Sequence, residues 1–203
     1  MRNRETLLVF ARHPQKGRVK TRLAREIGED AALRIYMRML VGTLDLARAQ
    51  AALSRRVSVW VDPAEGLPAF QHGWGKGLPC HPQSGGGLGE RLAVAFETAW
   101  SEGASRVLAI GSDCPALSSA HLDQAFDSLS RTPAVLGPAL DGGYYLIGLS
   151  KPVLGLFEDI PWSTPEVLAK TLEKLERAGI HPELLETLSD VDEAKDLAKE
   201  THA

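Results

Sequence analysis

Short apolar runs alternate with longer amphipathic stretches along most of the chain. The runs at 7–10, 57–61 and 106–110 have the length of strands, and the β-branched residues of the last run suit a strand buried on both faces of a parallel sheet. Apolar residues at helical spacing predict helices over 29–44 and 88–100. This alternation predicts an α/β fold with a doubly wound, mostly parallel sheet.

The later part of the chain departs from strict alternation. Strands at about 134–137 and 144–149 follow one another without a helix between them, which predicts some antiparallel pairing in a mixed sheet. The segment Ser163-Thr-Pro-Glu166 matches a capping box and predicts a long helix that begins there and ends at Gly179. Further expected elements are strands at 79–82 and 183–187 and a helix over 119–129; the segment 64–77 gives no clear pattern.

Length and composition indicate one domain that spans 1–203. A chain of 203 residues can bury roughly 70% of its unfolded surface, and no Pro/Gly/Ser linker divides it. The net charge is −3, from 23 Lys and Arg against 26 Asp and Glu, so nothing indicates nucleic acid or a membrane as partner. Cys80 and Cys114 form neither a CxxC motif nor a disulfide framework. We therefore expect a cytoplasmic protein without a signal peptide or a membrane span.

One carboxylate stands directly after a predicted central strand. Asp113 lies in Gly111-Ser-Asp-Cys-Pro115, which follows the apolar run 106–110 without a spacer. Ligands of open α/β sheets bind outside the carboxyl ends of the strands, so Asp113 is a candidate ligand for a divalent cation that also contacts phosphate oxygens. Ser118 or Ser119 would cap the next helix. The alternative is a turn aspartate that bonds its own backbone.

The loop after the first strand is strongly basic. It carries five Lys and Arg residues between positions 12 and 22. With a helix that begins near Val19, Arg12, Lys20 and Arg22 would form a cradle for phosphate groups. The alternative is a solvated basic loop. Lys20-Thr21 resembles the end of a P-loop, but Gly17 stands three residues before Lys20 and the required earlier glycine is missing, so a P-loop is excluded.

Further motifs fall on loops that this topology brings toward the same edge of the sheet. The glycines of 85–89 would let the backbone approach a ligand, or they form a flexible connection. Asp141-Gly142-Gly143 makes a hairpin turn or opens space for a substrate. The carboxylates of Asp190-Val-Asp192 cap a short helix or complete a metal site with Asp113. Trp162 stacks on a ligand or fills the edge of the core.

The combination of motifs resembles the nucleotide-diphospho-sugar transferase superfamily of GT-A type. More narrowly, it is similar to the bacterial radical-SAM and selenodomain-associated transferases, a family also described as arsenosugar biosynthesis glycosyltransferases. The resemblance covers about 6–197. The motifs that carry it are 10–23, 85–92, 111–115, 137–144, 161–164, and Asp190-Val-Asp192 with Asp196-Leu197.

The resemblance implies a metal-dependent transferase that uses a nucleotide-activated donor, with glycosyl transfer to a small-molecule acceptor as the first candidate. The alternatives are a nucleotidyltransferase of guanylyltransferase type, with a nucleoside triphosphate as donor, and a nucleotide-binding module without catalysis. The implied cofactor is Mg or Mn. The implied sites are catalytic Asp113, Lys20 and Asp141; nucleotide-binding Arg12, Lys20, Arg22, Gly86, Gly87 and Gly89; acceptor-binding Asp141, Gly142, Gly143 and Trp162; and metal-binding Asp113 and Asp192.

The tail departs from the family pattern at one point. Glu193-Ala-Lys195 stands where the family more often has Thr-Pro-Glu. The departure leaves open whether Asp190 or Asp192 is the second metal carboxylate. The donor base, the acceptor, the stereochemical outcome and the oligomeric state are not indicated by the sequence.

Overall fold

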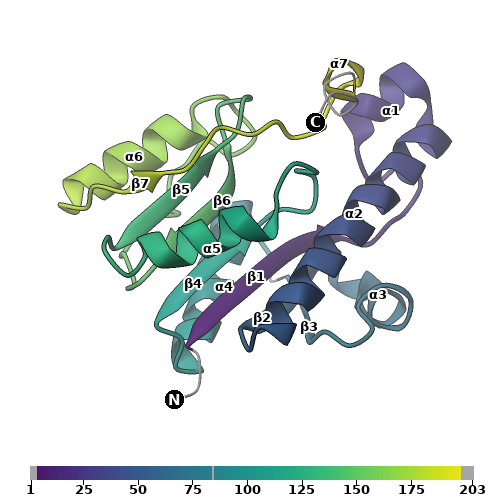
Figure 1. The fold of residues 1–203 in the computed structure, drawn as a ribbon. Coiled ribbons are helices and arrows are strands. Elements are labelled where there is room, and N and C mark those ends of the chain that lie inside the picture. The colour runs from purple at the N-terminus through teal and green to yellow at the C-terminus, as the bar shows by residue number, and fades with distance from the viewer. Residues whose placement is uncertain (1–3, 84, 198–203) are drawn as a thin grey trace.

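The fold is built on one seven-stranded sheet. The computed structural model describes residues 4–83 and 85–197, and Figure 1 shows its arrangement. The strand order is β3-β2-β1-β4-β6-β5-β7, and β6 runs antiparallel to both of its neighbours while the other paired strands run parallel. The predicted mixed, mostly parallel sheet is confirmed. The strands are β1 (Glu5–Arg12), β2 (Arg56–Asp62), β3 (Cys80–Pro82), β4 (Arg106–Ile110), β5 (Ala134–Pro138), β6 (Tyr144–Leu149) and β7 (Glu183–Leu184).

Helices cover both faces of the sheet because the central strands carry apolar side chains on both faces. In β4, Leu108 and Ile110 pack into one core layer with residues of α2, α3 and α5, while Val107 and Ala109 pack into the other with residues of α4 and α6. Figure 1 shows α2 and α5 in front of the sheet and α4 behind it. The helices are α1 (Thr21–Ile27), α2 (Glu29–Ala52), α3 (Leu67–Gly73), α4 (Leu88–Ser101), α5 (Ser119–Ser128), α6 (Val167–Arg177) and α7 (Ala194–Leu197), with a short 3-10 turn at Ala64–Gly66.

The start of α6 differs from the prediction. The expected capping box at Ser163 is wrong: Ser163 has a positive φ of 66°, the helix begins at Val167, and its N-cap, Glu166, has no side-chain capping bond. A tertiary hydrogen bond replaces the expected cap. The Leu168 N–H, in the first turn of α6, donates to the carbonyl of Gly142 in the turn after β5. At α5 the expected cap is confirmed: Ser118 forms a capping box with His121.

Two further boundaries differ from the prediction, and one helix lies where none was predicted. Helix α1 begins at Thr21 rather than near Val19, and β7 spans only Glu183–Leu184. The segment without a clear pattern contains α3, whose buried Phe70 packs into the larger core layer. Within the described residues, no helix has the length and apolar character needed to cross a membrane.

Candidate functional site

A cleft lies at the carboxyl ends of β1 and β4, beside the loops that follow these two strands. It encloses about 770 Å³. The two strands are hydrogen-bonded neighbours, so the loops that follow them meet at one edge of the sheet. The cleft brings together nine of the residues singled out from the sequence: Arg12, Lys20, Arg22, Gly86, Gly87, Asp113, Asp141, Asp190 and Asp192.

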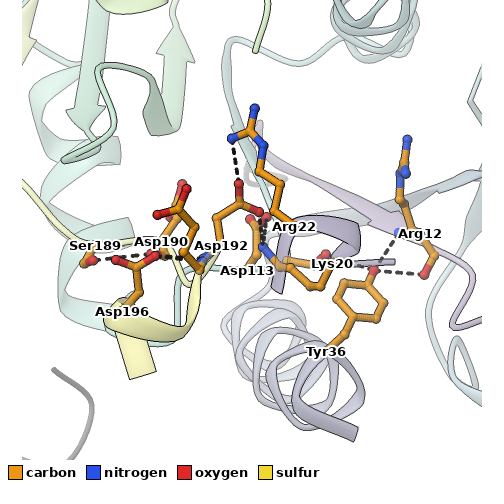
Figure 2. A network of polar contacts seen from close by, with 11 residues as sticks. Arg12, Lys20, Arg22, Tyr36, Asp113, Ser189, Asp190, Asp192 and Asp196 are labelled. Carbon is orange, nitrogen blue, oxygen red and sulfur yellow. Dashed lines mark hydrogen bonds and ion pairs between the residues drawn. The ribbon is translucent and has the colours of Figure 1, made fainter. Parts of the chain in front are cut away.

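Lys20 is the centre of the polar network in this cleft (Figure 2). Its Nζ donates to Asp113 Oδ2 at 2.9 Å and lies 3.5 Å from Asp192 Oδ1, although only 6% of the Lys20 side chain is exposed. Burial by itself lowers the pKa of Lys20, but the two carboxylates outweigh it, so the pKa is raised and the ammonium stays charged. Lys20 is also the N-cap of α1 and has a left-handed backbone, with φ 46°. The chain holds a strained lysine between two carboxylates.

The two flanking arginines are also paired. Arg22 Nη1 donates to Asp192 Oδ2 at 2.9 Å, and Arg12 Nε lies 3.3 Å from Asp62 Oδ2 at the end of β2. Both arginine side chains are more than half exposed, so they can turn toward a ligand in the cleft. Asp62 also accepts from Arg91 at 2.8 Å. The predicted basic loop is therefore balanced by carboxylates from distant segments.

Tyr36 lines the cleft, although in the sequence it is only one position of the amphipathic helix predicted over 29–44. Its hydroxyl accepts from the Arg12 N–H at 2.7 Å, donates to the Arg12 carbonyl at 2.9 Å and lies 3.2 Å from Ser112 Oγ. Burial raises the pKa of Tyr36 to about 12, so the phenol stays protonated. Tyr36 thus ties the end of β1, which carries Arg12, to the segment that carries Asp113.

Asp190 lines the cleft together with Asp113 and Asp192. The Val191 N–H donates to the Asp113 carbonyl, which holds the 190–192 segment against the end of β4, and Asp190 Oδ1 is buried without a hydrogen-bond partner. Burial, followed by the charges of Asp113 and Asp141, raises the pKa of Asp190 to about 7. Asp190 and Asp192 therefore have different environments: one oxygen of Asp190 is buried, whereas Asp192 is about 40% exposed and ion-paired.

The turn between β5 and β6 carries Asp141 into the cleft. Asp141 Oδ1 accepts from the Gly143 N–H at 2.8 Å, which is the local bond of a turn aspartate. Gly142 has φ 88°, and a Cβ at this position would lie 2.3 Å from the Pro165 carbonyl oxygen. The structure places Gly142 and Gly143 as turn residues that do not line the cleft, while Asp141 does. Their expected role at the acceptor stays a prediction.

Gly89 and Trp162 lie beside the cleft rather than in it. Both line a neighbouring cavity of about 640 Å³ between α4 and the segment 149–162. A Cβ at Gly89 would lie 2.2 Å from the Phe157 carbonyl oxygen and 2.8 Å from Trp162 Nε1, so this glycine permits the close approach of the segment to α4. The nucleotide contact predicted for Gly89 and the acceptor contact predicted for Trp162 are not tested by this placement.

The donor set of the cleft fits a hard divalent cation. Oxygens of Asp113 and Asp192 converge on one point, which the Lys20 ammonium occupies. Mg²⁺ is typically bound by one or two carboxylates together with substrate phosphates and water. Within residues 4–83 and 85–197, no group of three or more His, Cys, Asp and Glu side chains is placed to hold a metal ion. The fit is therefore to a cation shared with a phosphate ligand.

The comparisons with solved structures define the class of protein. A proposed nucleotide-diphospho-sugar transferase from Desulfovibrio desulfuricans G20 is 32% identical over 98% of this chain and 87% of its own, with a TM-score of 0.92. Rv0371c from Mycobacterium tuberculosis H37Rv is 20% identical over the whole of both chains, with a TM-score of 0.60. A CMP:2-keto-3-deoxy-manno-octonic acid synthetase with CTP is 16% identical over 97% of this chain and 96% of its own, with a TM-score of 0.53.

The fold is that of nucleotide-diphospho-sugar transferases and cytidylyltransferases, so the expected fold class is confirmed. The two less similar structures show the fold alone. The chain belongs to the family described as "Uncharacterized protein conserved in bacteria (DUF2064)", whose sequence pattern matches residues 43–164. No curated protein matches the chain. The expected enzyme class, a glycosyl- or nucleotidyltransferase, is consistent with the 32% identical structure, a proposed nucleotide-diphospho-sugar transferase.

Proposed function

We propose that this protein is a metal-dependent transferase that uses a nucleotide-activated donor, with glycosyl transfer to a small-molecule acceptor as its reaction. The observation that carries the proposal is the Lys20 ammonium held between Asp113 and Asp192 at the carboxyl ends of β1 and β4. A nucleoside diphosphate leaving group develops negative charge, which cations in a preorganised cleft stabilise. The narrower assignment to radical-SAM and selenodomain-associated transferases stays a prediction.

Different charged residues would bind the donor phosphates and the metal ion. Arg12 and Arg22, both half exposed, would turn from their carboxylates toward the donor phosphates, and Lys20 would bind them from the floor of the cleft. Asp113 and Asp192 would hold Mg or Mn, which supplies Lewis-acid stabilisation of the phosphate charge when bound. A Rv0371c structure that contains manganese, 20% identical with a TM-score of 0.54, also shares the fold.

Asp141 would contact the acceptor, because it lines the cleft from the turn after β5. In glycosyl transfer, the acceptor oxygen forms a bond to the anomeric carbon while the bond from that carbon to the diphosphate oxygen breaks. The electron pair leaves with the nucleoside diphosphate, and the acceptor proton passes to a carboxylate or to water. Asp141 is the carboxylate proposed to receive this proton, since its ordinary local bond involves only one of its two oxygens.

Nucleotidyl transfer is the second candidate, and the shared fold with a synthetase solved with CTP favours it. Here the acceptor would attack the α-phosphorus of a nucleoside triphosphate and release pyrophosphate. Both reactions use the same phosphate and metal ligands. A binding module without catalysis is the third candidate; Asp113 and Asp192 both being present argues against it.

A panel of thermal shifts tests the proposal. Wild type, Asp113→Asn and the control Asp45→Asn, an exposed aspartate of α2 that pairs with Arg48, would be heated with nucleoside triphosphates, diphosphates and nucleotide sugars, each with and without Mn²⁺. A ligand at about 100 times its Kd should raise the Tm by roughly 5 to 10 °C. A Mn²⁺-dependent shift for one nucleotide sugar, lost in Asp113→Asn only, supports glycosyl transfer.

Two other results would redirect the assignment. A larger shift with one triphosphate than with any nucleotide sugar would favour nucleotidyl transfer. The absence of a shift with every nucleotide would remove the donor site. Slow hydrolysis of the shifting nucleotide sugar by wild type, absent in Asp113→Asn, would separate an enzyme from a binding module.

A further inference from the structure

The cavity between α4 and the segment 149–162 is chemically unlike the cleft. One face of α4 lines it, through Gly89, Ala93, Phe96 and Trp100 at helical spacing. Opposite this face, the segment contributes apolar side chains that include Phe157. The face runs for about 20 Å from the first turn of α4 to its last. The volume of about 640 Å³ is within the range of small-molecule sites.

The walls of this cavity are aromatic. Phe96 and Phe157 lie with ring centroids 5.4 Å apart, and Phe96 and Trp100 lie 6.4 Å apart. Trp162 also lines the cavity and meets the Tyr144 ring edge-on at 6.3 Å. Four aromatic residues thus line one cavity: Phe96, Trp100, Phe157 and Trp162. Such an arrangement attracts a cation as well as apolar groups.

The charged side chains that line the cavity are acidic, and one cation, Lys174, reaches its wall by donating to the Gly155 carbonyl at 3.0 Å. Glu90, Glu97, Glu158 and Asp159 line it, and no Lys, Arg or His is among its described lining residues. None of these four carboxylates forms an ion pair within residues 4–83 and 85–197. The cleft, by contrast, is lined by Arg12 and other cations. A phosphate is therefore attracted to the cleft and repelled from the cavity.

The cavity and the cleft meet at two places. Gly87 lines both, and Trp162 of the cavity is followed directly by Ser163 and Thr164, which line the cleft. A ligand that fills the cavity would thus have one end beside the cleft. This continuity distinguishes the cavity from a remote hydrophobic surface.

We propose that the cavity is the acceptor subsite and that it takes an organic cation with an apolar body, such as a substituted ammonium compound. Aromatic rings and unpaired carboxylates together recognise this class of ligand, and neither recognises an anion. The acceptor role rests on the proposed function. Binding of the cation to the cavity does not, so the two can be tested separately.

The test uses benzyltrimethylammonium as the probe and benzenesulfonate as an anionic counterpart of similar size, both measured by titration calorimetry on the whole protein. Wild type is expected to bind the cation saturably. The sulfonate should bind at least about tenfold more weakly, which corresponds to a difference of about 1.4 kcal/mol in binding free energy. Ala93→Phe fills the cavity and should weaken the cation at least tenfold. Val94→Phe adds the same ring on a part of α4 that does not line the cavity, and should not.

The charge component has its own pair of variants. Glu97→Gln, inside the cavity, should weaken the cation several-fold, whereas Glu102→Gln, beyond the end of α4, should leave it unchanged. Comparable binding of the cation and the sulfonate, absence of saturable cation binding, or equal cation binding by Ala93→Phe and Val94→Phe would each overturn the proposal.

Nucleotide binding by the same variants separates this proposal from the proposed function. Ala93→Phe and Glu97→Gln should keep the Mn²⁺-dependent nucleotide shift of wild type. If nucleotides bind and the cation does not, the acceptor subsite is wrong while the donor site stands. If the cation binds and no nucleotide does, the acceptor role is overturned. A benzyl(2-hydroxyethyl)dimethylammonium probe, which adds a hydroxyl group, should accelerate consumption of the donor in wild type but not in Ala93→Phe.

Discussion

Replacing Lys20 by methionine should change the affinities for a divalent cation and for a nucleotide in opposite directions. The ammonium of Lys20 contacts Asp113 and Asp192, the two carboxylates proposed as metal ligands. A metal ion that binds without nucleotide must therefore compete with Lys20 for the same oxygens. Methionine keeps an unbranched apolar stem in the buried position and removes the competing charge.

The distances set the size of the effect. At an effective dielectric constant of about 20, point charges 2.9 Å and 3.5 Å apart attract by about 6 and 5 kcal/mol. Desolvation of the buried ammonium offsets most of this attraction, and both carboxylates are about 40% exposed and screened by water. A net value of about 1.5 kcal/mol, at the low end for a charged hydrogen bond, corresponds to about tenfold tighter Mn²⁺ binding in Lys20→Met.

The nucleotide should respond in the opposite sense. Lys20→Met loses a cation from the proposed phosphate site, so nucleotide affinity measured at saturating Mn²⁺ should fall by about tenfold or more. Mn²⁺ binding would be followed by the electron paramagnetic resonance signal of the free ion, and nucleotide binding by calorimetry. Lys16→Met is the matched control, because Lys16 is in the same loop but pairs with Asp30 instead.

Two results would refute this reasoning. If Lys20→Met binds Mn²⁺ more weakly than wild type while its unfolding remains cooperative, Lys20 does not compete with the metal. If nucleotide affinity is unchanged, Lys20 does not contact the phosphates. Lys20→Arg keeps the charge and should restore nucleotide affinity in part, which distinguishes a charge effect from a packing defect.

Three further changes have defined outcomes. Tyr36→Phe should lower the free energy of unfolding by about 2 kcal/mol in urea, because a buried hydroxyl with three partners is lost; an unchanged midpoint would contradict this. In EDTA, the raised pKa of Asp190, about 7, means that the unfolded chain releases this proton at lower pH than the folded chain. Between about pH 4 and pH 7, the free energy of unfolding of wild type should therefore fall relative to that of Asp190→Asn, by at most about 4 kcal/mol. Above pH 7 the difference between the two proteins should be constant. A difference that does not change between pH 4 and pH 7 would contradict the raised pKa of Asp190. Gly89→Ala should cost about 1–3 kcal/mol because its Cβ meets the Phe157 carbonyl, whereas Gly85→Ala, with open space around it, should cost little; equal Tm values for the two would show that the segment yields freely.

The sequence by itself determined the elements and the edge of the sheet at which the site lies. Strand and helix periodicity are local properties, so the alternation of apolar runs predicted the α/β fold and the antiparallel pair in its later half. Asp113 lies three residues after the end of β4, and the basic loop follows β1, so both had to reach the carboxyl edge once these strands paired. The order of strands, helices and loops along the chain was sufficient to predict at which edge of the sheet the site lies.

Only the tertiary structure decided which side chains meet. Lys20 contacts carboxylates 93 and 172 positions away along the chain, and no local pattern encodes such a pairing. The Tyr36 hydroxyl has its partners on β1 and in the loop after β4, while the same residue in sequence is only one apolar position of an amphipathic helix. The start of α6 likewise depends on the carbonyl of Gly142 in a distant turn. Side-chain partners are set by packing between elements, and packing acts on residues that are far apart in the sequence.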